Sequence, residues 1–191
     1  MKVVLFNGSP RKKGNTNHCL NIVTKELEAE GIECELIWMG LDNLRGCRAC
    51  YRCATSPEPK CSQTEDNLNS YIQKLLEADG IILGSPTFFS NMTSPMKALI
   101  DRAGLVCKLQ GSLLKYKVGA AVVAVRRAGA NHVFSSLNYF FLINEMIVVG
   151  STYWNLGIGL MPGDVLKDKE GVQTLENLGK NFSYTLKKLK S

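Results

Sequence analysis

Four cysteines lie close together in residues 47–61, at a spacing suited to binding metal. They are Cys47, Cys50, Cys53 and Cys61, in the pattern Cys-x2-Cys-x2-Cys-x7-Cys. Four thiolates on one flexible loop can converge on a single cubane iron–sulfur cluster. They also suit a tetrahedral zinc ion, and a metal-free role as thiols stays open. Successive x2 spacings favour the cluster over zinc, whose cysteine ligands typically come as separate pairs.

A second candidate site lies near the start of the chain, in the polar loop of residues 9–17. It follows the apolar run 3–6, typical of a buried parallel strand, and leads into a helical pattern. Such a loop combines short hydroxyls, unpaired backbone N–H groups and the positive end of a helix dipole. An ATP-binding loop is excluded because Asn15, not Lys, follows Gly14, and the three-glycine dinucleotide pattern is absent. The loop therefore predicts a site for one terminal phosphate.

A third segment, residues 85–93, also follows an apolar run and carries Ser, Thr, Asn and two phenylalanines. Residues 87–91 offer aromatic faces, backbone donors and an amide, which suit a planar ligand. Phe88 and Phe89 could instead belong to the core. Because neighbouring side chains on an extended segment point in opposite directions, we expect one of the two to face the site.

The intervening pattern predicts the scaffold that positions these segments. Apolar runs at 3–6, 34–39, 80–84, 117–125 and 146–150 alternate with amphipathic helices, expected at 16–31, 65–78, 94–103, 131–144 and 172–189. This order predicts one α/β domain over residues 1–191, a doubly wound five-stranded parallel sheet between two helical layers. A cysteine-rich loop at about 40–62 extends from it. Ligands bind beyond the carboxyl ends of such strands, so the loops at Ser9, Pro86 and Arg126 should converge.

Composition narrows the function classes. The net charge is +6, but no basic stripe with interleaved aromatics appears, so nucleic acid is not an expected partner. No apolar run is long enough to span a membrane, and no export signal is apparent, so we expect a cytoplasmic protein. In that compartment seven cysteines indicate metal or redox chemistry. Cys19, Cys34 and Cys107, which lie in apolar patterns, are expected to be buried.

Three separated motifs carry a resemblance. Residues 8–16, 85–88 and 96–102 are similar to the NADPH-dependent FMN reductase branch of the flavodoxin-like superfamily. The resemblance implies a flavodoxin-like fold that binds FMN. By position, the phosphate would be held by Ser9, Arg11, Gly14, Asn15, Thr16 and Asn17. The ring and ribityl chain would be enclosed by Pro86, Thr87, Phe88, Phe89, Ser90 and Asn91. The loop of Arg126, Arg127, Ala128 and Gly129 would border the ring, and which arginine contacts it is open.

The cysteine spacing in turn resembles that of the iron–sulfur flavoproteins, a subgroup that binds a 4Fe–4S cluster beside FMN. This implies an oxidoreductase that passes electrons between a reduced donor, NAD(P)H or ferredoxin-like, and a small-molecule or protein acceptor. A metal-free NAD(P)H-dependent FMN or quinone reductase is one alternative. A non-enzymatic flavodoxin-like electron carrier is another, although such carriers tend to be acidic. The cofactor supplies the chemistry, so no catalytic side chain is predicted. The apolar run 139–142 predicts a homodimer or homotetramer.

Overall fold

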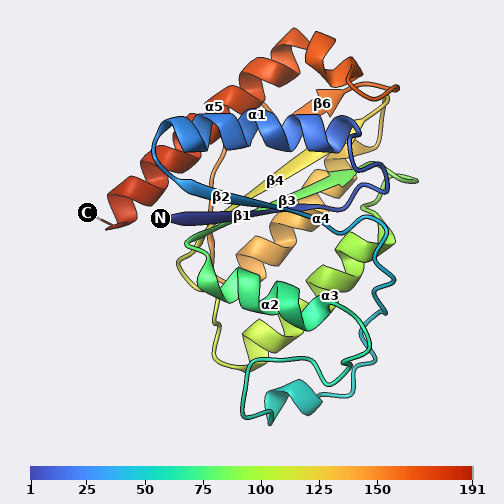
Figure 1. Cartoon of the computed structure of the whole chain (residues 1–191), viewed down its shortest axis with the longest axis vertical. Coiled ribbons are helices and arrows are strands. Elements are labelled where there is room, and N and C mark those ends of the chain that lie inside the picture. The colour runs from blue at the N-terminus through green and yellow to red at the C-terminus, as the bar shows by residue number, and fades with distance from the viewer. Residues whose placement is uncertain (191) are drawn as a thin grey trace.

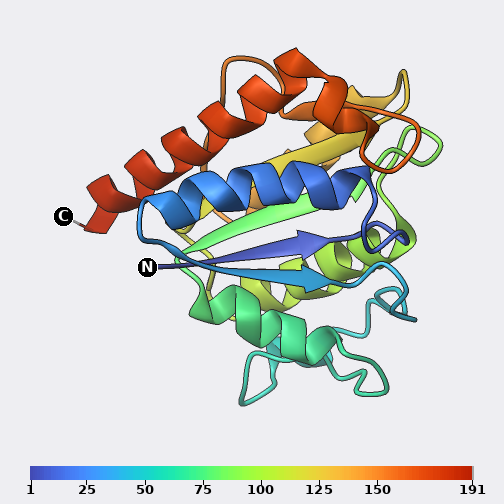
Figure 2. The same cartoon turned by 45° about the horizontal axis from the view of Figure 1, so that its top comes forward.

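The computed structural model describes residues 1–190 and shows a parallel sheet between two helical layers (Figures 1 and 2). The strand order is β2-β1-β3-β4-β5, with every pairing parallel. The strands are β1 (Lys2–Asn7), β2 (Glu33–Trp38), β3 (Gly80–Pro86), β4 (Val118–Val125), β5 (Ile147–Val148) and a short β6 (Leu156–Ile158). The predicted doubly wound five-stranded sheet is confirmed.

The helices divide between the two faces of the sheet. Figure 1 shows α1 and α5 over one face, and α2, α3 and α4 over the other. Their bounds are α1 (Asn15–Ala29), α2 (Leu68–Glu77), α3 (Ser94–Leu109), α4 (Ala130–Ile143) and α5 (Lys169–Lys190). Each face buries its own apolar cluster, and β1, β3 and β4 contribute alternate residues to both. Within residues 1–190, no helix combines the length and apolar character needed to cross a bilayer.

The fifth strand position differs from the prediction of one strand at 146–150. β5 pairs only with the start of β4, and the unpredicted β6 pairs with its end. Between them Asn155 supplies the missing partners: its Nδ2 donates to the Ala121 carbonyl at 3.0 Å, and its carbonyl accepts from the Val123 N–H at 3.0 Å. The split keeps the backbone of β4 hydrogen-bonded. It also carries the chain after β6 to the carboxyl end of β4.

Helix α1 begins earlier than expected. The sequence places its start at Thr16 or Asn17, which are both good N-cap residues. In the structure the N-cap is Gly14, and no side chain caps the helix. The hydroxyl of Thr16 is therefore not used as a cap. At the other end Gly31, where the predicted helix ends, is the C′ residue: its φ is +74°, and the N–H groups of Gly31 and Ile32 donate to the carbonyls of Glu28 and Leu27.

The cysteine-rich segment connects β2 to α2 and lies beside α2 and α3, away from the sheet (Figures 1 and 2). Its one regular element is the short 3-10 turn η1 (Arg52–Ala54). Helix α2 starts at Leu68, three residues later than predicted. Asp66 lies before the helix rather than in it, and its Oδ1 accepts a hydrogen bond from the N–H of Leu68, the first helical residue. Of the three scattered cysteines, Cys19 and Cys107 are buried, whereas Cys34 is only partly buried.

Candidate functional site

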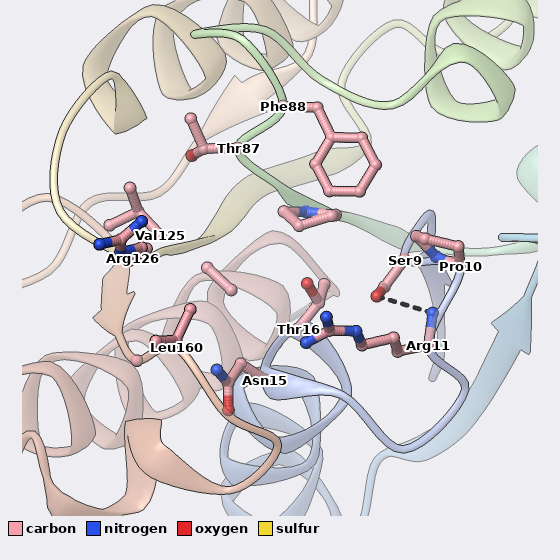
Figure 3. Close-up of a pocket in the computed structure, with 13 residues that line it drawn as sticks. Ser9, Pro10, Arg11, Asn15, Thr16, Thr87, Phe88, Val125, Arg126 and Leu160 are labelled. Carbon is pink, nitrogen blue, oxygen red and sulfur yellow. Dashed lines mark hydrogen bonds between the residues drawn. The ribbon is translucent and has the colours of Figure 1, made fainter.

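The loops after β1, β3 and β4 converge on one cleft at the carboxyl edge of the sheet (Figure 3). A fourth segment, after β6, closes its side. The residues that line the cleft are Ser9, Pro10, Arg11, Asn15, Thr16, Pro86, Thr87, Phe88, Ala124, Val125, Arg126, Gly159 and Leu160. The topology therefore gathers the three segments that the sequence singled out, as expected at a switch point in strand order.

Tertiary hydrogen bonds fix the backbone of the first loop. The Trp38 indole Nε1 donates to the Ser9 carbonyl at 2.8 Å, and the Ser9 N–H donates to Asn7 Oδ1 at 3.0 Å. The Arg11 N–H donates to Ser9 Oγ at 3.2 Å, the bond drawn in Figure 3. At Gly40 a Cβ would lie 1.7 Å from the Ser9 carbonyl oxygen, so the two backbones are in direct contact. The loop is preformed.

This end of the cleft suits an anion. The first N–H groups of α1 lack intrahelical partners, and no side chain caps them. Thr16 Oγ1 is buried without a hydrogen-bond partner, and the side chain of Arg11 points into the cleft (Figure 3). None of the described residues lining the cleft is acidic. These donors fit a phosphate group.

The loop after β3 forms a tight hairpin at the opposite end. The N–H of Phe88 donates to the Asn91 carbonyl at 2.8 Å, and the reverse bond measures 2.9 Å. At its tip Phe89 and Ser90 both have positive φ, +48° and +59°. The turn directs Phe88 to the cleft and leaves Phe89 fully exposed. Thr87 Oγ1 is buried in the cleft wall without a partner, as Thr16 Oγ1 is.

Some residues assigned by resemblance lie outside the lining. Asn17 Oδ1 accepts a hydrogen bond from Asn7 Nδ2, while Phe89, Ser90 and Asn91 form the far side of the hairpin. After β4 it is Arg126 that lines the cleft. The lining does not include Arg127, Ala128 or Gly129.

Gly129 instead supports the hairpin: its φ is +86°, and a Cβ there would lie 2.5 Å from Ser90 Oγ.

Gly159 and Leu160 are cleft residues that the sequence interpretation missed. The Gly159 N–H donates to the Val125 carbonyl at 2.9 Å, which attaches this segment to the end of β4. Asn15 Oδ1 accepts the Gly163 N–H at 2.9 Å and ties the same segment to α1. The available signal was the short apolar run 156–160 inside the long irregular stretch after the predicted fifth strand.

The four clustered cysteines line one small cavity of their own, against α3. Cys47 and Cys50 are exposed, whereas Cys53 and Cys61 are buried. Left-handed backbone at Ala49 and Tyr51, with φ of +48° and +55°, bends the chain between the first three cysteines. Within residues 1–190, no three His, Cys, Asp or Glu side chains form a ready site for a single metal ion.

Side chains of α2, of α3 and of its C-cap residue Gln110 hold the buried Cys53 and Cys61 in place. The Cys61 N–H donates to Asn69 Oδ1 at 2.8 Å, and Asn69 Nδ2 donates to the Cys61 carbonyl at 3.0 Å. Arg102 Nε donates to Cys61 Sγ at 3.3 Å. Gln110 Nε2 donates to the Cys53 carbonyl at 2.6 Å. All three polar atoms of Cys61 are therefore engaged.

The thiol pKa values shift in opposite directions at the exposed and the buried cysteines of the cavity. Hydrogen bonding from Ser62, 3.4 Å away, and from the Arg52 backbone lowers the pKa of the exposed Cys50 thiol. Burial raises the pKa of Cys53, and the charges of Cys61, Cys50 and Cys47 raise it further. Four thiolates here would need a compensating positive charge. Arg102, which is buried beside Cys61, is placed to provide it.

Arg102 is the functional residue at this site that the sequence interpretation missed. It belongs to the motif at 96–102, but no role was expected for it. A signal was present: Arg102 occupies the same helical face as Leu99, Ala103 and Val106, all of which are buried. A charged residue on an apolar helical face indicates a buried partner.

Comparison with known proteins agrees with this geometry. Residues 1–160 match the NADPH-dependent FMN reductase family. An iron–sulfur flavoprotein of Methanocaldococcus jannaschii is 38% identical, with all of both chains covered. One of Archaeoglobus fulgidus is 31% identical, over 95% of this chain and 94% of its own. A solved archaeal flavodoxin superposes with a TM-score of 0.63 at 18% identity, over 98% of this chain and 99% of its own, which confirms the flavodoxin-like fold. The chain belongs to the NADPH-dependent FMN reductase family, grouped with its iron–sulfur flavoproteins, and is a flavin-dependent oxidoreductase whose cofactor is FMN.

Proposed function

We propose that FMN binds with its phosphate against the loop of residues 9–16 and its ring between Phe88 and the end of β4. The unpartnered hydroxyls of Thr16 and Thr87, at the two ends of the cleft, support this placement. Arg11 and the uncapped start of α1 supply positive charge at the phosphate end. Arg126 lines the cleft, so we assign it, rather than Arg127, to the ring edge.

We further propose that Cys47, Cys50, Cys53 and Cys61 hold a 4Fe–4S cluster. The observation that carries this assignment is the single cavity that all four line together with the buried Arg102. N–H groups directed at sulfur fit thiolate ligands: Ala49 N donates to Cys47 Sγ at 3.4 Å, and Arg102 Nε donates to Cys61 Sγ. The names of the iron–sulfur flavoprotein relatives add support.

The proposed function is electron transfer between a reduced donor, NAD(P)H or a ferredoxin-like protein, and an acceptor. Bound FMN would supply hydride and single-electron chemistry, and a cluster would add a second one-electron centre. The protein's own part is to orient the two groups and to balance their charge. Arg11, Lys12, Lys13 and Arg126, all exposed near the cleft, would attract an anionic donor.

Iron, sulfide and flavin analysis of anaerobically purified protein tests the proposal. Wild type should contain about four irons and one FMN per chain, the content of one 4Fe–4S cluster and one cleft. Cys53→Ala should lose the iron and keep FMN, whereas the matched control Cys34→Ala should keep both. FMN without iron in wild type would overturn the cluster and favour the metal-free FMN or quinone reductase. Failure of both NADPH and NADH to bleach the flavin on rapid mixing would exclude a nicotinamide donor.

We also propose that the chain self-associates through the groove between α3 and α4. Tyr139, Leu142 and Ile143 are exposed there, although Phe140 and Phe141 of the same run are buried. Sedimentation over a range of concentrations should show a homodimer or homotetramer, and a monomer at every concentration would overturn this. We expect the protein to act in the cytoplasm, where its thiols would stay reduced.

A further inference from the structure

Arg102 is the largest of the fully buried side chains among the described residues, with only 1% of its surface exposed. Burying a guanidinium is expensive unless each of its donors is paired. Here the donors are paired with the segment that carries the cysteines and its continuation to α2. Nε donates to Cys61 Sγ at 3.3 Å, Nη1 to the Arg45 carbonyl at 3.1 Å, and Nη2 to the Gln63 carbonyl at 3.0 Å.

The charge of Arg102 is balanced on one side only. Asp66 Oδ2 lies 2.5 Å from Nη1, and its side chain is 7% exposed. Cys61 Sγ meets the guanidinium at Nε instead. The positive end of the ion pair, at Nε of Arg102, therefore faces the Cys61 sulfur. The Asp66 carboxylate is bonded to a different nitrogen, Nη1. Such a pair acts on the sulfur as an oriented dipole.

Holding the loop in place does not by itself explain a charge at this position. Asn69 already fixes the backbone of Cys61 and Gln110 that of Cys53, both with uncharged amides. The bonds from Nη1 and Nη2 to the Arg45 and Gln63 carbonyls are made to neutral acceptors, which do not require a charged donor. The feature that Arg102 alone contributes is a buried positive group directed at a ligand sulfur.

We propose that Arg102 raises the reduction potential of the centre held by the four cysteines, acting through Cys61 as a positioning residue. This rests on the proposed function, in which those cysteines bind an iron–sulfur cluster. One-electron reduction adds a negative charge, which spreads onto the ligand sulfurs. A hydrogen bond from a cation stabilises that extra charge, and bonds to the sulfurs are a known determinant of cluster potentials. Asp66 moderates the effect, because its negative charge opposes that of Arg102.

Redox titration of the reconstituted holoprotein, followed by electron paramagnetic resonance, tests the inference. Arg102→Gln removes the charge and should disfavour cluster reduction at least tenfold in equilibrium constant, which is 59 mV for one electron. Arg102→Lys keeps the charge and should lie between Gln and wild type. Asp66→Asn removes the opposing charge and should shift the potential upward. The matched control is Arg48→Gln, the same change at an exposed arginine of the same cavity, where solvent screening should limit the shift to less than threefold.

Opposite shifts in the Arg102 and Asp66 variants would establish the electrostatic role, since loss of packing alone has no reason to reverse sign. If Arg102→Gln fails to fold, Arg102→Lys and Asp66→Asn still decide the matter through the signs of their shifts. A cluster present at full iron content with a potential unchanged in all three variants overturns the inference and leaves the proposed function intact. Wild type that binds no iron after anaerobic reconstitution overturns both.

Discussion

The cleft and the cysteine cavity are built in different ways. The cleft lies at the carboxyl edge of the sheet, and several of its donors are backbone groups that the fold places there. The cavity lies away from the sheet on a segment with one short 3-10 turn, held by side chains such as Arg102, Asn69 and Gln110. The shape of the cleft therefore depends mainly on backbone, whereas a single side-chain truncation can loosen the support of the cavity.

Gly40→Ala should produce the largest effect, confined to the cleft. Its Cβ would lie 1.7 Å from the Ser9 carbonyl oxygen, so the loop of residues 9–17 must move. We expect unfolding to become easier by about 3 kcal/mol or more, the upper range for overpacking. FMN affinity should fall at least tenfold, measured by fluorescence titration.

Gly46→Ala is the matched control on the cysteine side. A Cβ at Gly46 has no neighbour within 4 Å, and its φ is not in the left-handed region. FMN affinity should change less than twofold. Equal FMN affinity in Gly40→Ala and wild type would show that the contact with Ser9 does not shape the cleft.

Asn69→Ala should have the converse effect, weakening the cysteine cavity and sparing the cleft. The amide donates to the carbonyls of Cys61 and Gln63 and accepts the Cys61 N–H. Leaving these buried groups unpaired costs about 1–3 kcal/mol. Iron should dissociate faster in the presence of a chelator, while FMN affinity stays unchanged.

Asn177→Ala provides the comparison for that experiment. Asn177 is on α5, where its Nδ2 donates to Thr152 Oγ1 at an exposed position. Its iron release and FMN affinity should match those of wild type. A loss of FMN in Asn69→Ala as large as the loss of iron would mean that the two sites are not separable.

The sequence predicted the cleft better than the cavity because the cleft is built from strand ends and the cavity from distant side chains. Buried parallel strands are continuous apolar runs, as in β1 and β4, so their carboxyl ends and the loops that follow can be located from local pattern. The four clustered cysteines can be listed from their spacing alone. Their support cannot, because Arg102 contacts residues 36 to 57 positions away, and nothing local encodes those distances.

Two errors in the elements have equally specific causes. β6 is only three residues long, and Asn155 replaces ladder bonds that a longer strand would have made, so the strand pattern is too short to recognise. The start of α1 was misplaced because Thr16 and Asn17 are good capping residues, and the sequence offered no reason to prefer Gly14. The structure supplies that reason, since the Thr16 hydroxyl faces the cleft and has no partner in the loop.

Phe89→Asn should have the smallest effect and would sharpen the boundary of the cleft. Phe89 has a φ of +48° at the tip of the hairpin, a conformation that Asn tolerates better than Phe. Its side chain is fully exposed and does not line the cleft. We expect the variant to be more stable by up to about 1 kcal/mol in thermal unfolding, because local strain is relieved.

FMN affinity should be unchanged in Phe89→Asn, whereas Phe88→Ala should weaken it, because Phe88 is the aromatic residue that lines the cleft. Weaker FMN binding in Phe89→Asn would mean that the hairpin closes over the flavin, and would extend the cleft beyond the loops that the strand ends determine.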